Sequence, residues 1–178
     1  MRRWWPLYPF PLAWAAQLHQ ESRCDPLAVS PAGARGLAQF MPATWAETSR
    51  RLSLPPGSTP HGRLAIDAGA YYMARAMAAW TAERPMTERW RLGLASYNAG
   101  LGHILKAQRG CAGARDWREI SPCLPAVTGR HAAETTGYVA RIPEHWRRFA
   151  LRRDGFGRQV GGCSPRAAPP ELRTEWRC

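Results

Sequence analysis

Glu21 is the residue of this sequence best suited to acid–base chemistry. It follows an apolar run, residues 11–18, whose aromatic and aliphatic side chains can hold a carboxyl in poorly solvated surroundings and keep it protonated. A carboxyl in that state can donate a proton to a leaving group and act as a general acid. Taken alone, Glu21 is better explained as a solvated glutamate at the end of a helix, since most glutamates are exposed. The case for catalysis therefore depends on the rest of the chain.

Helices must position this carboxyl and the segments after it. Pro11 suits the first turn of a helix, so we expect a helix over residues 11–22. The prolines and the glycine of residues 24–35 predict a loop. Residues 37–52 are compatible with a helix that is interrupted or restarted at Pro42.

The next segments predict longer helices. Residues 88–97 form a helix that Thr87 can cap and that ends at glycines, and a short helix through residues 104–105 follows. Residues 64–84 carry one buried apolar stripe at helical spacing, formed by Ile66, Ala70, Met73, Met77 and Trp80.

The last part of the chain contains one long helix. Residues 110–130 are expected to be irregular, with one turn around residues 117–120. A helix over residues 132–153 must kink near Pro143. No stretch of the sequence shows sustained period-two alternation. The predicted fold class is therefore all-α, with little or no sheet.

Length and charge limit the possible functions. The chain has 178 residues, enough for one domain, which we place at residues 1–153, followed by a Gly-, Pro- and Arg-rich tail over residues 154–178. The 25 basic and 13 acidic residues give a net charge of +12, which indicates a polyanionic partner: nucleic acid, an anionic membrane surface or an acidic wall polymer. With Lys106 as the single lysine and no nucleic-acid-binding motif, we do not expect a nucleic-acid role.

The five cysteines show no C-x-x-C spacing, so we expect no metal site and no thioredoxin-type chemistry. Cys111 and Cys123 flank a loop and are the best candidates for a disulfide. The alternative is that all five cysteines are reduced and serve as small apolar residues. An oxidising compartment is therefore left open by the sequence.

The first residues superficially resemble a signal peptide, with two arginines before a short apolar stretch. Three prolines interrupt that stretch, and cleavage after it would remove the helix that presents Glu21. We therefore expect residues 1–10 to belong to the mature protein. No run reaches the roughly 18 apolar residues of a membrane span, so no transmembrane segment is expected.

Four segments, in the expected order, resemble the soluble lytic transglycosylases. Residues 21–30 resemble the family's E-S-x-x-x-P-x-A-x-S signature, and residues 33–42 resemble G-A-x-G-L-M-Q-x-M-P. Residues 95–100 resemble A-x-Y-N-A-G, and residues 134–139 resemble E-T-x-x-Y-V. One departure is Ala38, where the family often has Met, which alters packing but removes no proton-transfer group. The resemblance implies a helical, lysozyme-like fold related to goose-type lysozyme.

The resemblance also implies a reaction without a cofactor. Most glycosidases use two carboxylates, but this family uses one, here Glu21, first as acid and then as base. The N-acetyl group of the substrate acts as internal nucleophile, and the sugar's 6-hydroxyl closes a 1,6-anhydro ring. The reaction is non-hydrolytic cleavage of the MurNAc-β-1,4-GlcNAc bond of peptidoglycan. None of Asp25, Asp67 and Glu134 shows a context that marks it as a second catalytic carboxylate.

By the same resemblance, further residues contact the glycan. Met41 could instead be core, and Tyr138 and Glu134 could have structural roles. Ser22 is interpreted as a hydrogen-bonding residue at a helix end, and His103 as non-catalytic. The expected substrate-binding residues are Ser30, Gln39, Met41, Tyr97, Asn98, Tyr138 and Glu134.

Two other functions remain possible from the sequence: a hydrolytic muramidase on the same fold, and a cationic wall-binding protein that disrupts membranes by charge. The expected partners are peptidoglycan glycan strands and the anionic cell envelope, and the expected state is a monomer. Without an evident export signal, we interpret the chain as a bacteriophage endolysin. It would be made in the host cytoplasm, released by a membrane-permeabilising partner, and act in the periplasm and cell wall of a Gram-negative host.

Overall fold

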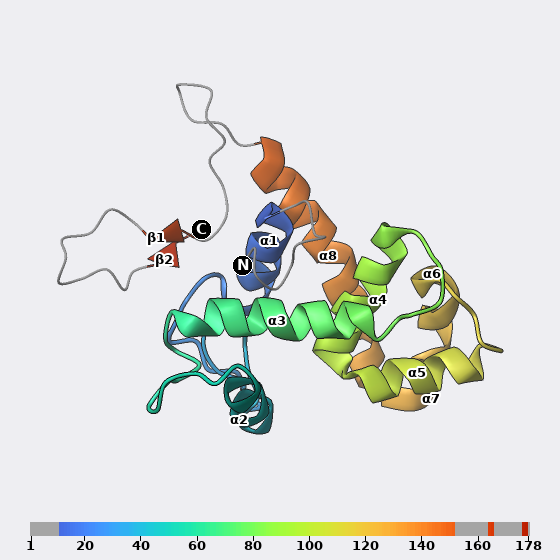
Figure 1. The fold of residues 1–178 in the computed structure, drawn as a ribbon. Helices are drawn as coiled ribbons and strands as arrows, with labels where there is room; N and C mark the ends of the chain where they lie inside the picture. The colour runs from blue at the N-terminus through green and yellow to red at the C-terminus, as the bar shows by residue number, and fades with distance from the viewer. Residues whose placement is uncertain (1–10, 152–163, 166–175, 178) are drawn as a thin grey trace. The chain divides into compact units, whose positions relative to one another are not determined.

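The computed structural model of the chain describes residues 11–151, 164–165 and 176–177. Almost all of the regular structure in these residues is helical (Figure 1), which confirms the expected all-α fold class. A two-stranded antiparallel pair, β1 (Ser164–Pro165) and β2 (Trp176–Arg177), is the exception. The helices are α1 (Pro11–Ser22), α2 (Pro42–Arg51), α3 (Leu64–Ala78), α4 (Met86–Ala99), α5 (Leu101–Gly110), α6 (Trp117–Ile120), η1 (Ser121–Cys123), α7 (Pro125–Thr128), η2 (Gly129–His131) and α8 (Ala132–Leu151).

The first helix agrees with the prediction, and the second begins at Pro42, where the sequence allowed a restart. Gly36 and Gln39 have backbone φ angles of 73° and 46°, which an α-helix cannot contain. The backbone N–H groups and carbonyls of Arg35 and Phe40 instead pair with each other, at 2.9 and 3.0 Å. Of the two alternatives for residues 37–52, the restart is therefore the correct one, and Pro42 is the first residue of α2.

The expected helix over residues 64–84 is too long, because α3 ends at Ala78. Trp80 lies beyond that end yet is buried, and its indole N–H donates to Ser96 Oγ at 3.0 Å. Residues 110–130 are more helical than expected: α6 lies where a turn was predicted, and η1, α7 and η2 follow it. The prolines of η1 and α7 occupy their first turns, where a missing N–H costs nothing.

The chain divides into two compact units. Unit 1 comprises residues 1–71 and 142–178, and unit 2 comprises residues 72–141. The boundaries fall inside α3 and α8, so each of these helices contributes residues to both units. The expected boundary between a domain and a tail near residue 153 lies outside the described residues, as do residues 1–10.

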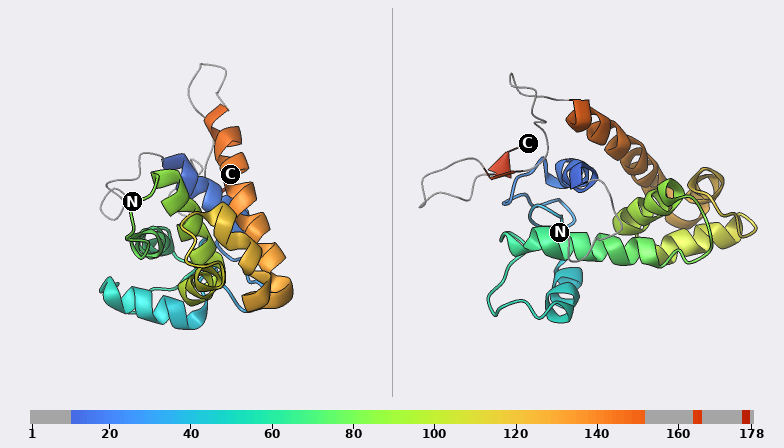
Figure 2. Two further views of the ribbon diagram at one scale, coloured as in Figure 1. Left: turned by 90° about the vertical axis from the view of Figure 1, so that its right-hand side faces the viewer. Right: turned by 45° about the horizontal axis from the view of Figure 1, so that its top comes forward.

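Unit 1 is built around the first helix. Trp14 of α1 is 1% exposed and packs closely on Gly69 of α3, where an added Cβ would lie 2.8 Å from the indole ring. On another side, α1 lies beside the C-terminal half of α8 (Figure 1, Figure 2), where the rings of His19 and His145 meet edge to face at 4.8 Å. The core of this unit consists of side chains such as Trp14, Leu18, Leu37, Phe40 and Ile142.

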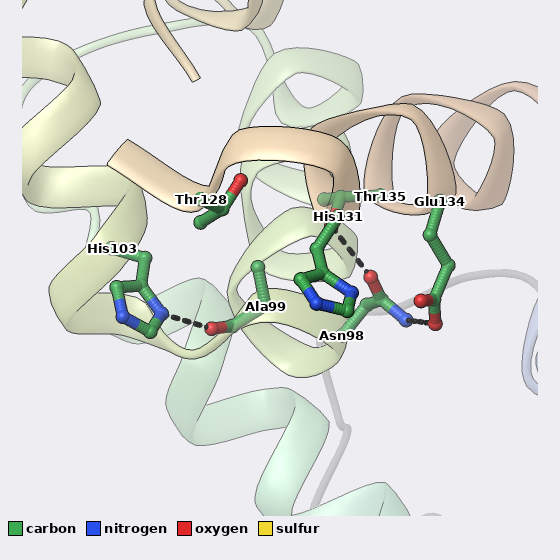
Figure 3. Close-up of a pocket in the computed structure, with 7 residues that line it drawn as sticks. All are labelled: Asn98, Ala99, His103, Thr128, His131, Glu134 and Thr135. Carbon is green, nitrogen blue, oxygen red and sulfur yellow. Dashed lines mark hydrogen bonds between the residues drawn. The ribbon is translucent and has the colours of Figure 1, made fainter. Parts of the chain in front are cut away.

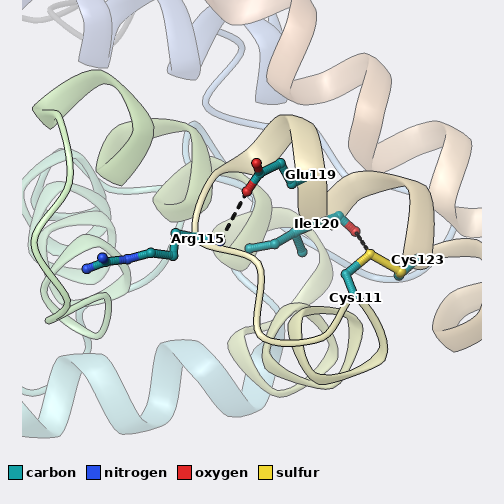
Figure 4. The surroundings of a disulfide bond; sticks show 5 residues. All are labelled: Cys111, Arg115, Glu119, Ile120 and Cys123. Atoms are coloured by element: carbon teal, nitrogen blue, oxygen red, sulfur yellow. Dashed lines mark hydrogen bonds between the residues drawn. A yellow bond between two sulfur atoms is a disulfide. The ribbon is translucent and has the colours of Figure 1, made fainter.

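Unit 2 has its own core and a disulfide. Cys111 and Cys123 are bonded, with 5.8 Å between their Cα atoms, and close the segment that carries α6 (Figure 4). Cys24 of unit 1 is also disulfide-bonded, so the alternative of reduced cysteines is wrong for the three described ones. The apolar core of unit 2 includes Met73, Leu92, Leu94, Ile104, Ile120 and Leu124.

Within the described ranges, no helix combines the length and the apolar character that crossing a membrane requires. The same ranges contain no group of three or more histidine, cysteine, aspartate or glutamate side chains able to hold a metal ion.

Candidate active site

Glu21 lies in the last turn of α1 and is partly exposed. The backbone leaves the helix sharply after it, since Arg23 and Cys24 have φ angles of 52° and 65°. The Ser22 hydroxyl contacts two carbonyl oxygens, that of Leu18 at 3.2 Å and that of Leu37 at 3.0 Å. As predicted, Ser22 is thus a hydrogen-bonding residue at a helix end. It ties the turn that carries Glu21 to the segment that carries Gln39.

The loop between α1 and α2 is held by short backbone bridges, Val29 with Arg35 and Arg35 with Phe40. Ser30 Oγ accepts the Ala34 N–H at 3.0 Å, which leaves its hydroxyl hydrogen able to donate to a ligand. The Ser30 side chain therefore has both a structural bond and a remaining donor.

Gln39 takes part in the same loop. Its Nε2 donates to the Gly36 carbonyl at 2.9 Å and to the Ala28 carbonyl at 3.3 Å. Because both amide hydrogens are used locally, its Oε1 acceptor is the atom that can receive a sugar N–H or O–H. Met41, at the N-cap of α2, is 44% exposed, which favours a contact with ligand over a place in the core.

The last turn of α1 packs against α8. His145 Nε2 lies 3.3 Å from Gln20 Oε1, so the imidazole must donate this bond. The ring of His19, next to Gln20, meets the ring of Phe149, one turn after His145, edge to face at 5.5 Å. These contacts fix the orientation of the helix end on which Glu21 stands.

In unit 2, Asn98 is the centre of a small polar network (Figure 3). The hydroxyl of Thr135, which is 2% exposed, donates to Asn98 Oδ1 at 2.7 Å, and Asn98 Nδ2 points to Glu134 Oε1 at 3.5 Å. The Thr135 bond fixes the orientation of the amide, with its NH₂ group toward Glu134. Asn98 and Glu134, 36 residues apart in the chain, are thus brought together as a pair.

A pocket of about 370 Å³ adjoins this network, and we call it the Asn98 pocket. His103, predicted to be non-catalytic, lines this pocket, and no sequence motif marks Ala99, Thr128 or His131 as lining residues. Their positions follow from the packing of α4, α5, α7, η2 and α8. The lining residues are Asn98, Ala99, His103, Thr128, His131, Glu134 and Thr135.

The two tyrosines predicted to contact the glycan, Tyr97 and Tyr138, differ in exposure. Tyr97 is partly exposed and its ring meets the Tyr72 ring edge to face at 5.2 Å. Tyr138 is 3% exposed, which favours a structural role over a contact with the glycan. The predicted residues thus fall into two groups: Glu21, Ser30, Gln39 and Met41 in unit 1, and Tyr97, Asn98, Glu134 and Tyr138 in unit 2.

Residues 13–120 match the model of the transglycosylase SLT domain. That span includes Glu21 and all the expected site residues up to Asn98. The chain belongs to the transglycosylase SLT family. Glu134 and Tyr138 lie beyond the matched span, so their assignment depends on the E-T-x-x-Y-V resemblance and on the contacts of Asn98.

Individual relatives agree with this membership of the SLT family. The chain is 30% identical over 146 residues to the membrane-bound lytic murein transglycosylase F of Alcanivorax borkumensis, covering 76% of this chain and 30% of that protein. The crystal structure of the 70-kDa soluble lytic transglycosylase of Escherichia coli is similar, with a TM-score of 0.61 and 27% identity over 89% of this chain and 24% of that one.

A second solved structure, a complex of the 70-kDa soluble lytic transglycosylase with bulgecin A, matches with a TM-score of 0.64 and 26% identity. The match covers 90% of this chain and 26% of that chain. These neighbours confirm the lysozyme-like fold of the SLT family. The chain spans only about a third or less of the relatives described here.

Proposed function

We propose that this SLT-family chain is a peptidoglycan lytic transglycosylase with Glu21 as its single acid and base. The observation that carries the proposal is the position of Glu21 in the matched family span. It stands on the turn that Ser22 ties to the Leu37 carbonyl, next to the loop of Ser30 and Gln39. The relatives named as lytic transglycosylases support the same activity.

The chemistry needs one carboxyl in two protonation states. Protonated Glu21 donates its hydrogen to the oxygen of the MurNAc-β-1,4-GlcNAc bond, and GlcNAc leaves with that proton. The N-acetyl oxygen of the muramic sugar bonds to C1 as the C1–O bond breaks. The Glu21 carboxylate then takes the proton of the 6-hydroxyl, whose oxygen displaces the N-acetyl oxygen at C1. The 1,6-anhydro ring closes, Glu21 is protonated again, and no water is consumed.

Two other carboxylates of unit 1, Asp25 and Glu47, have local structural partners. Asp25 Oδ1 accepts the Leu27 N–H at 2.8 Å, and Glu47 Oε1 accepts the Arg51 Nε hydrogen at 2.8 Å. Such bonds are typical of a turn and of an i,i+4 helix pair. This supports a mechanism in which Glu21 acts without a second catalytic carboxylate.

We assign substrate contacts to the residues that the family resemblance predicts. Ser30 donates to acetamido or lactyl oxygens, Gln39 Oε1 accepts a sugar hydrogen, and Met41 packs beneath a sugar ring. Tyr97, Asn98 and Glu134 contact the glycan as well. Tyr138, predicted as a further contact, is better suited by its burial to supporting α8 beneath Glu134.

Product analysis on purified peptidoglycan tests the reaction. We expect mass spectrometry to show muropeptides lighter by one water than the hydrolysis products, with anhydro ends in place of reducing ends. Predominantly reducing ends would instead identify a hydrolytic muramidase on the same fold. Absence of any soluble product would contradict glycan cleavage altogether.

The place of action we propose is the Gram-negative cell wall, reached as a monomeric bacteriophage endolysin during host lysis. The net charge of +12 supports an anionic envelope as its partner, and the Cys111–Cys123 bond supports an oxidising compartment. Expression in a Gram-negative host tests the route. Lysis should require a co-expressed membrane-permeabilising protein, and export with removal of the first residues would contradict it.

A further inference from the structure

The sharp turn after α1 has a backbone conformation that the surrounding structure must enforce. Arg23 and Cys24 both lie in the left-handed region, with φ angles of 52° and 65°, which carries an energetic penalty for residues with a Cβ atom. Such a conformation persists only where other contacts determine it. The contacts of this turn therefore show what keeps the end of α1, and with it Glu21, in place.

Two backbone hydrogen bonds close the turn. The Arg23 N–H donates to the His19 carbonyl at 2.9 Å, and the Asp25 N–H donates to the Ser22 carbonyl at 3.0 Å. Each bond joins residues only three or four positions apart in the chain. These bonds hold the turn together, but they do not attach it to the protein interior.

Cys24 supplies that attachment. Its side chain is 0% exposed, whereas Arg23 and Asp25 on either side of it are exposed. Cys24 is also disulfide-bonded, and its partner is neither cysteine of the unit 2 disulfide, since those two are bonded to each other. This covalent bond begins three residues after Glu21 and restrains the left-handed backbone directly.

We propose that Cys24 is a positioning residue for Glu21, and that the enzyme reaches full activity only when the Cys24 disulfide has formed. This inference rests on the proposed function and adds regulation to it. To form the bond, the thiols of Cys24 and of a second cysteine lose two protons and two electrons to a disulfide oxidant such as oxidised glutathione. The oxidant leaves as two thiols.

This dependence links activity to the compartment in which the chain is found. Disulfides are rare in a reducing cytoplasm and persist in an oxidising compartment. A chain made in the cytoplasm therefore carries Glu21 on a turn that is held by local hydrogen bonds alone. The turn becomes fixed on arrival at the wall, so the enzyme is most active where its proposed substrate lies.

The first test compares the reduced and the oxidised protein. The wild type is unfolded, reduced and refolded with either dithiothreitol or oxidised glutathione, and mass spectrometry after alkylation counts its thiols. We expect kcat for release of muropeptides from purified wall to be about tenfold lower or more in the reduced protein, since displacing a catalytic group by about 1 Å can cost a hundredfold. The apparent KM should change little, because Ser30 and Gln39 have their own hydrogen bonds in the loop.

Variants separate the bond at Cys24 from the disulfide of unit 2. The matched control is Cys111→Ser/Cys123→Ser, whose kcat should respond to reduction as that of the wild type does. Cys24→Ala should have the low kcat under both conditions, and a thermal unfolding curve checks that it is folded. In Cys24→Gly, residue 24 adopts a φ of 65° without penalty, so its kcat should exceed that of Cys24→Ala. A role in packing alone predicts the opposite order, because glycine leaves the larger cavity.

Amide hydrogen exchange supplies a readout that does not depend on activity. The Arg23 and Asp25 amides should exchange about tenfold faster in the reduced wild type, because their bonds to His19 and Ser22 open more often. Equal kcat and equal exchange in the two redox states, or a Cys24→Gly variant less active than Cys24→Ala, would overturn the proposal. If the oxidised protein cleaves no wall, the proposed function is contradicted, and the exchange rates still decide the role of Cys24.

Discussion

At the scale of single residues, Glu21 owes its position to its neighbours. Ser22 binds the Leu37 carbonyl, and Gln20 accepts a hydrogen bond from His145 of α8. Glu21 itself is partly exposed. The residues on either side of Glu21 thus hold the backbone that carries it.

Glu21→Gln should abolish turnover and preserve the fold. The amide has nearly the same shape but cannot exchange a proton, so we expect kcat to fall about a thousandfold, as for loss of a general acid. Release of soluble muropeptides from purified wall measures this. Glu144→Gln, at an exposed position of α8, is the matched control and should retain wild-type activity. Undiminished lysis of cells by Glu21→Gln would favour charge-driven membrane disruption.

Gln17 lies one helical turn before Glu21 and is 0% exposed. Neither its Nε2 nor its Oε1 has a hydrogen-bond partner in the described part of the chain. A buried unpaired amide costs about 1 to 3 kcal/mol, so Gln17→Leu should raise the free energy of unfolding by about 1 kcal/mol or more. Urea denaturation measures the change.

The control for that substitution is Gln20→Leu in the same helix. It removes the acceptor of the His145 bond and should lower the free energy of unfolding. If both variants were destabilised alike, the buried amide of Gln17 would have to be satisfied in solution, for example by a bound water.

At the scale of elements, the turn between Gly36 and Phe40 positions the loop beside α1. Gly36 has a φ of 73°, and a Cβ added there would overlap the Pro60 carbonyl. The turn can therefore approach the loop before α3 only because residue 36 has no side chain. Gln39, at a φ of 46°, then bonds back to the carbonyl of the same glycine.

Gly36→Ala should therefore lower the free energy of unfolding by more than the backbone penalty for a positive φ alone. We expect it to lower the free energy of unfolding by about 3 kcal/mol or more and to reduce kcat/KM, since Leu37 and Gln39 must move. Gly33→Ala is the matched comparison, because Gly33 has a φ of 85° but an added Cβ there would meet nothing within 4 Å. Gly33→Ala should lower the free energy of unfolding by about 1 kcal/mol. Equal losses in urea denaturation would show that the contact with Pro60 does not matter.

At the scale of the whole molecule, the net charge of +12 governs encounter with the substrate. The Debye length falls from about 30 Å at 0.01 M salt to about 3 Å at 1 M. Over that range the apparent KM for whole peptidoglycan should rise several-fold, because long-range attraction is screened. Turbidity clearing of purified wall measures it. Cleavage of peptide-free glycan strands, which carry fewer carboxylates, should change much less, and an equal salt effect on both would contradict electrostatic steering.

The sequence by itself determined the helical class, the extent of α1, the role of Ser22 as a hydrogen-bonding residue at a helix end, and the likeness to the SLT family. These follow from short-range features: Pro11 in a first turn, the apolar spacing in α3, and motifs whose residues are close together in the chain. Helix start signals and the spacing of apolar residues along the chain predict such features directly.

Only the tertiary structure decided that residues 37–41 are not helical, that α3 ends early and which residues line the Asn98 pocket. The Pro60 carbonyl, 24 residues further along the chain, lies so close to residue 36 that only a glycine fits there. Trp80 is buried against Ser96 of another helix. His131 reaches the pocket through Gly129 and the packing of α8 beside α4. Each is a long-range contact, and local sequence patterns contain no signal for such contacts.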